Sequence, residues 1–169
     1  MGDLTPKDRL QPSLIDRLTD DEPGTRSEAP ERRTLSLGRL RESVRRDLAH
    51  LLNATQLAAV VDLSAFPEVE RSTLNYGIPD LAGHTASTLD RATLVRLIRR
   101  AITDFEPRLL KQSLKVHITV NPDKHEPNAL RFDIEADLWS QPLPLRLRLR
   151  TDLSLEDGEA HLTEVAVGG

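Results

Sequence analysis

Cysteine is absent from this chain of 169 residues, and aromatic side chains are scarce. Without cysteine, the chain has no thiol nucleophile, no cysteine-ligated zinc and no disulfide framework. It has one Trp, one Tyr and three Phe, so we expect a core built from Leu, Val, Ile and Ala. Scarce aromatic rings also leave few platforms on which a sugar or a nucleobase can stack. Composition therefore counts against thiol enzymes, cysteine-zinc proteins and catalytic clefts that grip such ligands.

Long apolar runs are also missing. No stretch approaches the roughly 18 apolar residues that a membrane-spanning helix requires. The N-terminal sequence MGDLTPKDRLQPSLIDRL has no apolar run of the signal-peptide type, so we expect an intracellular protein. The net charge of −4 disfavours general nucleic-acid binding. Arginine, by contrast, is abundant, because only four of the 23 basic residues are lysine.

The N-terminal region differs in composition from the rest of the chain. Residues 1–34 are polar and rich in proline and charge, and such a segment buries too little apolar surface to fold alone. We therefore expect a flexible N-terminal arm, followed by a compact domain over residues 35–169.

One segment of this arm, PSLIDRL, predicts a short docking helix near residues 13–18. Ser13 is placed to cap it, with Asp16 three positions later. Three apolar side chains share one face of this helix: Leu14, Ile15 and Leu18. Two interpretations are open, because such a segment can bind another protein or fold back on its own domain.

Two segments have apolar residues at every third or fourth position, which predicts helices over residues 36–53 and about 88–104. Pro107 stops the second helix. Between them, Pro and Gly residues break regular structure over residues 54–86. Apolar side chains in this connection predict an ordered, packed loop: Leu63, Phe66, Val69, Leu74, Tyr76, Ile78 and Leu81.

Beyond Leu110 the apolar period changes to two, which predicts antiparallel strands at SLKVHITV, ALRFDIEADLW and LPLRLRLRTDL, with a weaker one at HLTEVAV. The polar face of the second strand is acidic and that of the third is basic, so we expect cross-strand ion pairs rather than a nucleic-acid-binding stripe. The predicted fold is α+β, with two main helices packed on a small antiparallel sheet of three or four strands. If the third strand or its neighbour lies at an edge, that edge can accept a strand from another chain.

No catalytic constellation is evident. The five histidines lack metal-ligand spacing, and there is no glycine-rich phosphate loop or serine elbow. Carboxylates are paired at Asp104 and Glu106 and at Glu68 and Glu70, but glycoside hydrolysis also needs a fixed separation and a sugar-binding cleft. We therefore expect no catalytic residue, no metal site and no cofactor.

Two segments are more distinctive than packing alone requires. In ERSTLNYGIPDL, Asn75 and Gly77 bracket the only tyrosine, as in a tight turn that projects one side chain. In FEPRLL, the helix stops where Glu106 and Arg108 can form an ion pair, because the planar guanidinium group matches a carboxylate. Such a pair is either buried or turned towards a partner.

Taken together, PSLIDRL, LRESVRRDLAHLLN, VERSTLNYGIPDL and FEPRLL resemble, in order and spacing, the TssE family. These are baseplate wedge subunits of bacterial type VI secretion systems, related to the baseplate wedge protein of contractile-tailed phages. The resemblance implies a structural protein, not an enzyme, in a cytoplasmic baseplate docked to a membrane. It implies the other wedge subunits and the contractile sheath proteins as partners, with sheath assembly templated by strand pairing. It implies no nucleic acid, no membrane insertion and no small-molecule substrate.

The resemblance also assigns protein-binding residues. They are Glu106, Pro107 and Arg108 in the EPR triplet, Ser72, Asn75, Tyr76 and Gly77 in the loop, and Leu14, Asp16 and Leu18 in the N-terminal segment. We expect alanine at Glu106 and Arg108 to leave the fold intact but to abolish sheath assembly. Two alternatives remain. One is a regulatory binding module like the anti-adaptor that protects the stationary-phase sigma factor from proteolysis, and the other is a muramidase-like glycoside hydrolase.

Overall fold

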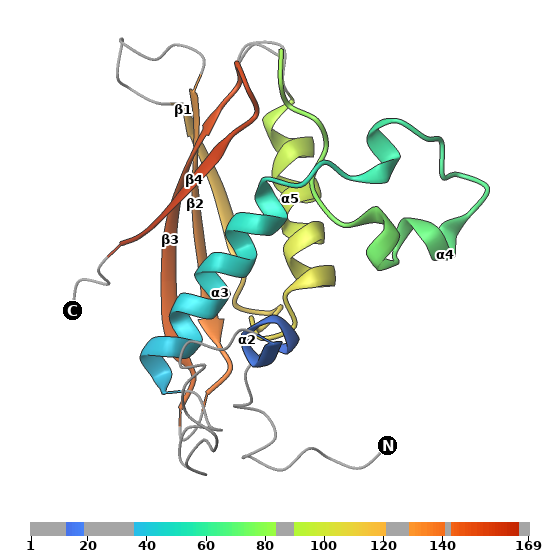
Figure 1. Cartoon of the computed structure of the whole chain (residues 1–169). Coiled ribbons are helices and arrows are strands. Elements are labelled where there is room, and N and C mark those ends of the chain that lie inside the picture. Colours follow the sequence, from blue (N-terminus) through green and yellow to red (C-terminus); the bar gives the residue numbers. More distant parts are fainter. Residues whose placement is uncertain (1–12, 19–35, 84–89, 121–128, 141–142, 166–169) are drawn as a thin grey trace.

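A computed structural model of the chain describes residues 13–18, 36–83, 90–120, 129–140 and 143–165. Two long helices, α3 (Leu37–Leu52) and α5 (Arg91–Phe105), pack on one four-stranded antiparallel sheet (Figure 1). The predicted α+β class, with two main helices on a small sheet, is therefore confirmed. Among the described residues, no helix is both long and apolar enough to cross a membrane.

Both long helices begin at side-chain caps. The Ser36 hydroxyl accepts a hydrogen bond from the Arg39 backbone N–H at 3.3 Å, and the Asp90 carboxylate accepts one from the Ala92 N–H at 3.1 Å. These bonds satisfy N–H groups that have no partner within the helix. α5 ends at Phe105, two residues before Pro107, as the sequence predicts.

The sheet is a meander of β1 (Lys115–Val120), β2 (Ala129–Leu138), β3 (Leu145–Ser154) and β4 (Ala160–Glu164). All four predicted strands are present, while residues 121–128 between β1 and β2 and residues 141–142 between β2 and β3 lie outside the described residues. β3 is internal, so the third strand is not an edge. Its neighbour β4 forms one edge and β1 forms the other.

The predicted charge pairing between β2 and β3 is confirmed. Asp133 lies opposite Arg150, Glu135 opposite Arg148, and Asp137 opposite Arg146. The closest nitrogen–oxygen distances are 3.2, 3.2 and 3.0 Å in that order. A slip of one residue would turn these charges into the core, so the pattern fixes the register.

The core between the helices and the sheet is aliphatic, as expected, with Phe132 as the one fully enclosed aromatic side chain among the described residues. Its largest fully buried side chains come from both helices, the strands and the turn after β3: Val44, Leu48, Leu51, Ile98, Ile102, Leu130, Ile134, Leu138, Leu147, Leu149, Leu153 and Leu155. The helices are thereby held rigidly on one face of the sheet.

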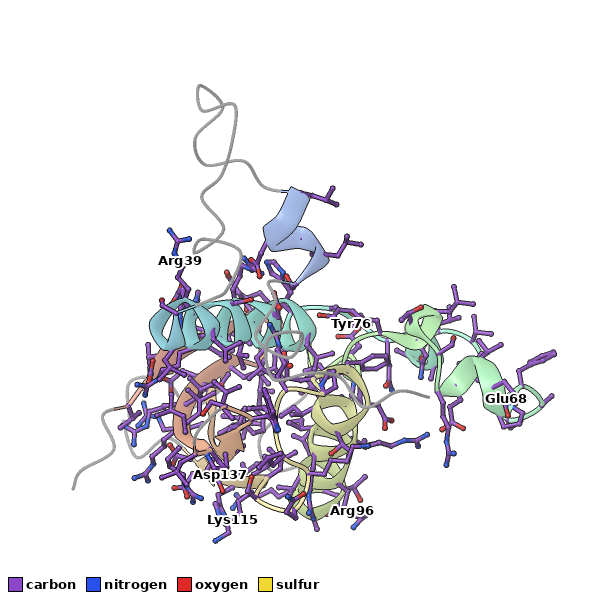
Figure 2. All side chains as sticks on the ribbon, turned by 90° about the horizontal axis from the view of Figure 1, so that it is seen from below. Arg39, Glu68, Tyr76, Arg96, Lys115 and Asp137 are labelled. Carbon is purple, nitrogen blue, oxygen red and sulfur yellow. The ribbon has the colours of Figure 1, made fainter. Side chains whose placement is uncertain are left out.

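The connection between α3 and α5 projects from this body as a lobe, defined as residues 57–75 (Figures 1 and 2). It contains the short helices η2 (Leu57–Ala59), α4 (Pro67–Glu70) and η3 (Thr73–Asn75). The prediction of an ordered loop is confirmed, but two of its expected apolar anchors are exposed. Phe66 is 59% exposed and Leu74 is 69% exposed, because the lobe extends beyond the core.

Candidate protein-binding site

The carboxylate of Asp16 attaches the arm helix α2 (Leu14–Leu18) to α3. Asp16 Oδ2 accepts hydrogen bonds from the hydroxyls of Ser13 at 2.7 Å and Ser43 at 2.8 Å. Its Oδ1 accepts one from Arg46 Nη1 at 2.5 Å. The polar side of the segment therefore folds back on its own domain, which is one of the two interpretations that the sequence leaves open.

The apolar side of α2 is not used in this attachment. Leu14 is 69% exposed, Ile15 57% and Leu18 76%, and the helix lies on the outer side of α3 (Figure 2). Exposed large apolar side chains gathered on one element are typical of interaction surfaces. Binding to another protein remains the prediction for this side of α2.

The attachment of α2 is electrostatic at neutral pH. Burial opposes ionisation of Asp16, but hydrogen bonds from Arg46, Ser13 and Ser43 outweigh it and hold the pKa of Asp16 well below its ordinary value. The same contact with Asp16, together with Asp47, raises the pKa of Arg46. Asp16 and Arg46 are thus both charged across the physiological range.

The end of α5 forms a corner, defined as residues 105–108, that holds the predicted ion pair in buried form. Glu106 is 4% exposed, and its two carboxylate oxygens accept from Arg108 Nε at 2.6 Å and Nη2 at 2.5 Å. Asp47 Oδ2 accepts from Arg108 Nη2 at 2.6 Å. Burial works against the charge of Arg108, but Glu106 and Asp47 raise its pKa. Within the triplet, Pro107 alone is exposed.

Ser43 joins the arm helix to the corner. This side chain is 4% exposed; its hydroxyl donates to Asp16 and accepts from Arg108 Nη1 at 3.1 Å. The result is one polar cluster, which consists of Asp16, Ser43, Arg46, Asp47, Glu106 and Arg108. Shared acceptors and donors of this kind couple the positions of the groups that they join.

Two of the predicted loop residues hold the lobe in shape. Ser72 caps η3 by accepting from the Leu74 N–H at 3.2 Å. Asn75 is 7% exposed; its side chain donates to the Glu70 carbonyl at 2.9 Å and accepts from the Ala58 N–H at 2.8 Å. Both residues therefore position the lobe from within, and they leave Leu74 on its surface.

The other two loop residues lie between the lobe and the corner. Gly77 has φ +126°, and a Cβ atom there would lie 2.2 Å from the carbonyl oxygen of Ala54. The ring of Tyr76 packs edge-on against Phe105 with centroids 5.2 Å apart. Burial, with the nearby charges of Asp47 and Glu106, raises the pKa of Tyr76.

An open groove of about 470 Å³ brings the three predicted segments together. Its lining includes Ile15 from α2, His50 and Leu51 from α3, Tyr76 from the loop, and Phe105 and Pro107 from the corner. Of the other predicted residues, Glu106 and Arg108 also line it, whereas Leu14, Asp16, Leu18, Ser72, Asn75 and Gly77 do not. Three members of the polar cluster, Asp47, Glu106 and Arg108, thus form part of the lining beside these side chains.

Sequence reasoning missed two parts of this arrangement. It assigned no contact to Arg46, Asp47 and Ser43, which hold the arm helix and the corner. A serine beside the inward-facing Val44 was the available signal. It also missed the apolar surface of the lobe, where Val60 is 81% and Val61 45% exposed.

The carboxylates considered for hydrolysis are mostly engaged with arginine. Arg100 binds Glu70 at 3.0 Å and Asp104 at 3.6 Å, while both oxygens of Glu106 bind Arg108. Within the described part of the chain, no three His, Cys, Asp or Glu side chains are arranged to hold a metal ion.

Comparisons with known proteins identify the family of this chain. Searches of curated proteins and of solved structures gave no match. The family model of the baseplate wedge protein gp25, GPW_gp25, matches residues 38–143, which is more than half of the chain. The match runs from α3 to the end of β2 and includes the lobe, the loop and the corner. The chain therefore belongs to the GPW_gp25 family of baseplate wedge proteins, a family of structural proteins, as its resemblance to TssE implies.

Proposed function

We propose that this chain is the wedge subunit of a type VI secretion baseplate that joins the other wedge subunits to the contractile sheath. The observation that carries the proposal is the groove, because it gathers residues from α2, the loop and the corner. The family membership supplies the baseplate context. In this role the protein works by binding, in the cytoplasm at a membrane-docked complex, without a cofactor or a small-molecule substrate.

The groove suits a helix or loop of another wedge subunit. Interfaces draw most of their binding energy from a few apolar or aromatic side chains in a well-packed centre. Tyr76, Phe105 and Pro107 supply such side chains, and the polar cluster braces the corner that carries two of them. A preformed groove loses little conformational entropy when a partner binds. In the EPR triplet, Glu106 and Arg108 thus hold the conformation of the corner, and the exposed Pro107 contacts the partner.

The lobe offers a second surface for wedge partners. Its exposed large apolar side chains are Val60, Val61, Phe66 and Leu74. The salt bridge between Glu70 and Arg100 ties the lobe to α5, and Asn75 braces it internally. A projecting, braced element of this kind reaches a neighbour that the body of the domain does not touch.

The sheet provides the means of joining the sheath. Strand addition at an open sheet edge gains affinity from main-chain hydrogen bonds, and side-chain pairing selects the partner. Because β3 is internal and its arginines pair with β2, those arginines do not supply register to a partner strand. The pairing site in the proposal is an edge strand instead.

Co-purification from cells that co-express the remaining wedge subunits tests this proposal. Tagged full-length protein should retain them, whereas Pro107→Asp and Ile15→Asp, which place a charge in the groove, should reduce recovery at least tenfold. Arg99→Asp, on the exposed face of α5, is the matched control and should retain the subunits.

Equal recovery by the groove variants and the control would refute the role of the groove. Failure of the wild-type protein to retain any wedge subunit would refute the baseplate assignment itself.

A further inference from the structure

The two edges of the sheet differ in whether their backbone groups are already bonded. On β4, the Ala160 N–H donates to Asn53 Oδ1 at 2.8 Å, and the Ala160 carbonyl accepts from Asn53 Nδ2 at 2.9 Å. The Leu162 carbonyl accepts from Arg45 Nη1 at 3.4 Å. Asn53 caps the C-terminal end of α3 and Arg45 lies in its middle, so this helix and its cap take the place that a neighbouring strand would occupy. The β4 edge is closed over these residues.

The direction of each backbone group follows from the alternation of antiparallel pairs. On β3, the Arg148 carbonyl accepts from Val165, and the Ser154 N–H donates to Glu159, so even-numbered β3 residues face β4 and odd-numbered ones face β2. Leu149 pairs with Ile134. Even-numbered residues of β2 therefore face β3, and odd-numbered ones face β1.

The same alternation assigns the outer edge of β1. Lys115 pairs with Glu135 and His117 with Asp133, so both bond inwards to β2. The backbone groups of Val116, Ile118 and Val120 consequently point away from the sheet. None of the described residues bonds to them, in contrast to the capped groups of β4. β1 is an open edge within the described part of the chain.

The two edges also differ in the charged side chains beside them. Lys115 is exposed on the β1 edge (Figure 2). Beside β4, the carboxylate of Glu164 is ion-paired with Arg41 of α3, and Arg45 of the same helix contacts the strand. The exposed cation on β1 therefore favours a partner strand that carries an acidic residue opposite it.

We propose that β1 is the acceptor edge and that it pairs with an extended segment of a sheath subunit that carries Asp or Glu opposite Lys115. This inference rests on the proposed function, which supplies the sheath as the partner. Val116, Ile118 and Val120 contribute the main-chain hydrogen bonds, and Lys115 contributes selectivity. β4 takes no strand, because Asn53 occupies its first outward pair of groups.

Residue-resolved amide hydrogen exchange on the full chain gives the most direct test, with and without the purified sheath subunits. In the free protein, the amides of Val116 and Ile118 should exchange at least tenfold faster than those of Lys115 and His117. Added sheath subunits should slow amide exchange at Val116 and Ile118 at least tenfold and leave the exchange rate at Ala160 unchanged. Ala160 should already be protected, and Asn53→Ala should remove that protection.

Matched proline variants test the edges in cells by counting assembled sheaths with a fluorescent sheath subunit. Ile118→Pro removes an outward N–H of β1, and Glu164→Pro removes one of β4, while neither breaks the pairing within the sheet. We expect at least a tenfold loss of sheaths for Ile118→Pro and near wild-type numbers for Glu164→Pro. Lys115→Glu changes only a side chain and should also reduce the number of sheaths. This variant tests the β1 edge even if Ile118→Pro impairs folding.

The outcomes separate this inference from the function on which it rests. Sheath-dependent protection of β4 with no change in β1 overturns the choice of edge but leaves strand pairing intact. No protection at either edge, with wedge subunits still bound, refutes strand pairing to the sheath.

Discussion

Replacing Glu106 by Gln should measure how much the buried ion pair stabilises the fold. The carboxylate accepts from the Arg108 backbone N–H at 3.2 Å, from Nε at 2.6 Å and from Nη2 at 2.5 Å. An amide removes the charge and turns N–H groups towards the guanidinium group. Removing one partner of a buried pair costs about 3–5 kcal/mol. In the variant, Arg108 keeps its ion pair with Asp47, and the Arg108 side chain is 23% exposed. We therefore expect the free energy of unfolding to fall by about 2–3 kcal/mol, the upper part of the range for one hydrogen bond to a charged group.

Urea unfolding followed by the fluorescence of Trp139 suits this measurement. Trp139 is the only tryptophan, and its backbone N–H donates to the Arg108 carbonyl at 2.8 Å. In a thermal scan the same loss should lower Tm by about 4–12 °C, since 1 kcal/mol shifts a chain of this size by about 2–4 °C. Glu135→Gln is the control, because this sheet-face residue is 23% exposed and pairs with arginines that are 40% exposed.

The control should lose less than about 1 kcal/mol, the usual limit for exposed pairs. If Glu106→Gln costs no more than Glu135→Gln, the corner is not held by its ion pair, and the reasoning about a braced groove is wrong.

Three further predictions follow from the same contacts. Asp16→Asn should release α2, seen as a broadened distance distribution between spin labels on introduced cysteines in α2 and α5, because the chain has no native cysteine. Docking lowers the pKa of Asp16 below its ordinary value of 3.8. The attachment of α2 should therefore be complete above pH 3.8 and weaken only as the pH falls further. Loss of the attachment between pH 8 and pH 5 would contradict the role of Asp16. Absorbance titration of Tyr76, the only tyrosine, should give a pKa above 10.0, because burial and then the charges of Asp47 and Glu106 disfavour the tyrosinate. A pKa at or below 10.0 would count against the packing of Tyr76 beside the corner. Gly77→Ala should destabilise the protein by more than about 2 kcal/mol in urea, and by clearly more than Gly83→Ala, which shares a positive φ but would meet no atom within 4 Å.

The helices and strands were predictable because each carries a local signal. α3 and α5 repeat apolar residues at helical spacing between a capping residue and a stop, and the strands alternate strictly. The charge ladder between β2 and β3 followed from the same alternation, since Asp133 and Arg150 lie on polar faces. The ion pair of Glu106 and Arg108 was within reach because its members are two residues apart.

The arrangement around the groove was not predictable, because its contacts join residues far apart in the chain. Asp16 meets Arg46, and Ser43 meets Arg108, without any periodic signal. Phe66 and Leu74 look like core residues in sequence, and only their place on a projecting lobe makes them surface residues. The closure of the β4 edge by Asn53 likewise requires the packing of α3 on the sheet.

The structure also changes how the EPR triplet should be tested. Alanine at Glu106 and Arg108 was expected to leave the fold intact, but both side chains belong to the polar cluster, so we now expect such variants to lose stability. A loss of sheath assembly in them would combine unfolding with lost binding. Pro107 is exposed and supports no hydrogen bond within the cluster, so it is the residue of the triplet that reports on binding alone.

Photo-crosslinking in cells with an assembled secretion system tests the central claim most directly. A photoreactive amino acid at His50, an exposed residue that lines the groove, should crosslink to another baseplate subunit. The same probe at Arg39, exposed at the other end of α3, should not crosslink to that subunit. Crosslinks from Arg39 but not from His50 would contradict the claim that the groove holds a baseplate partner.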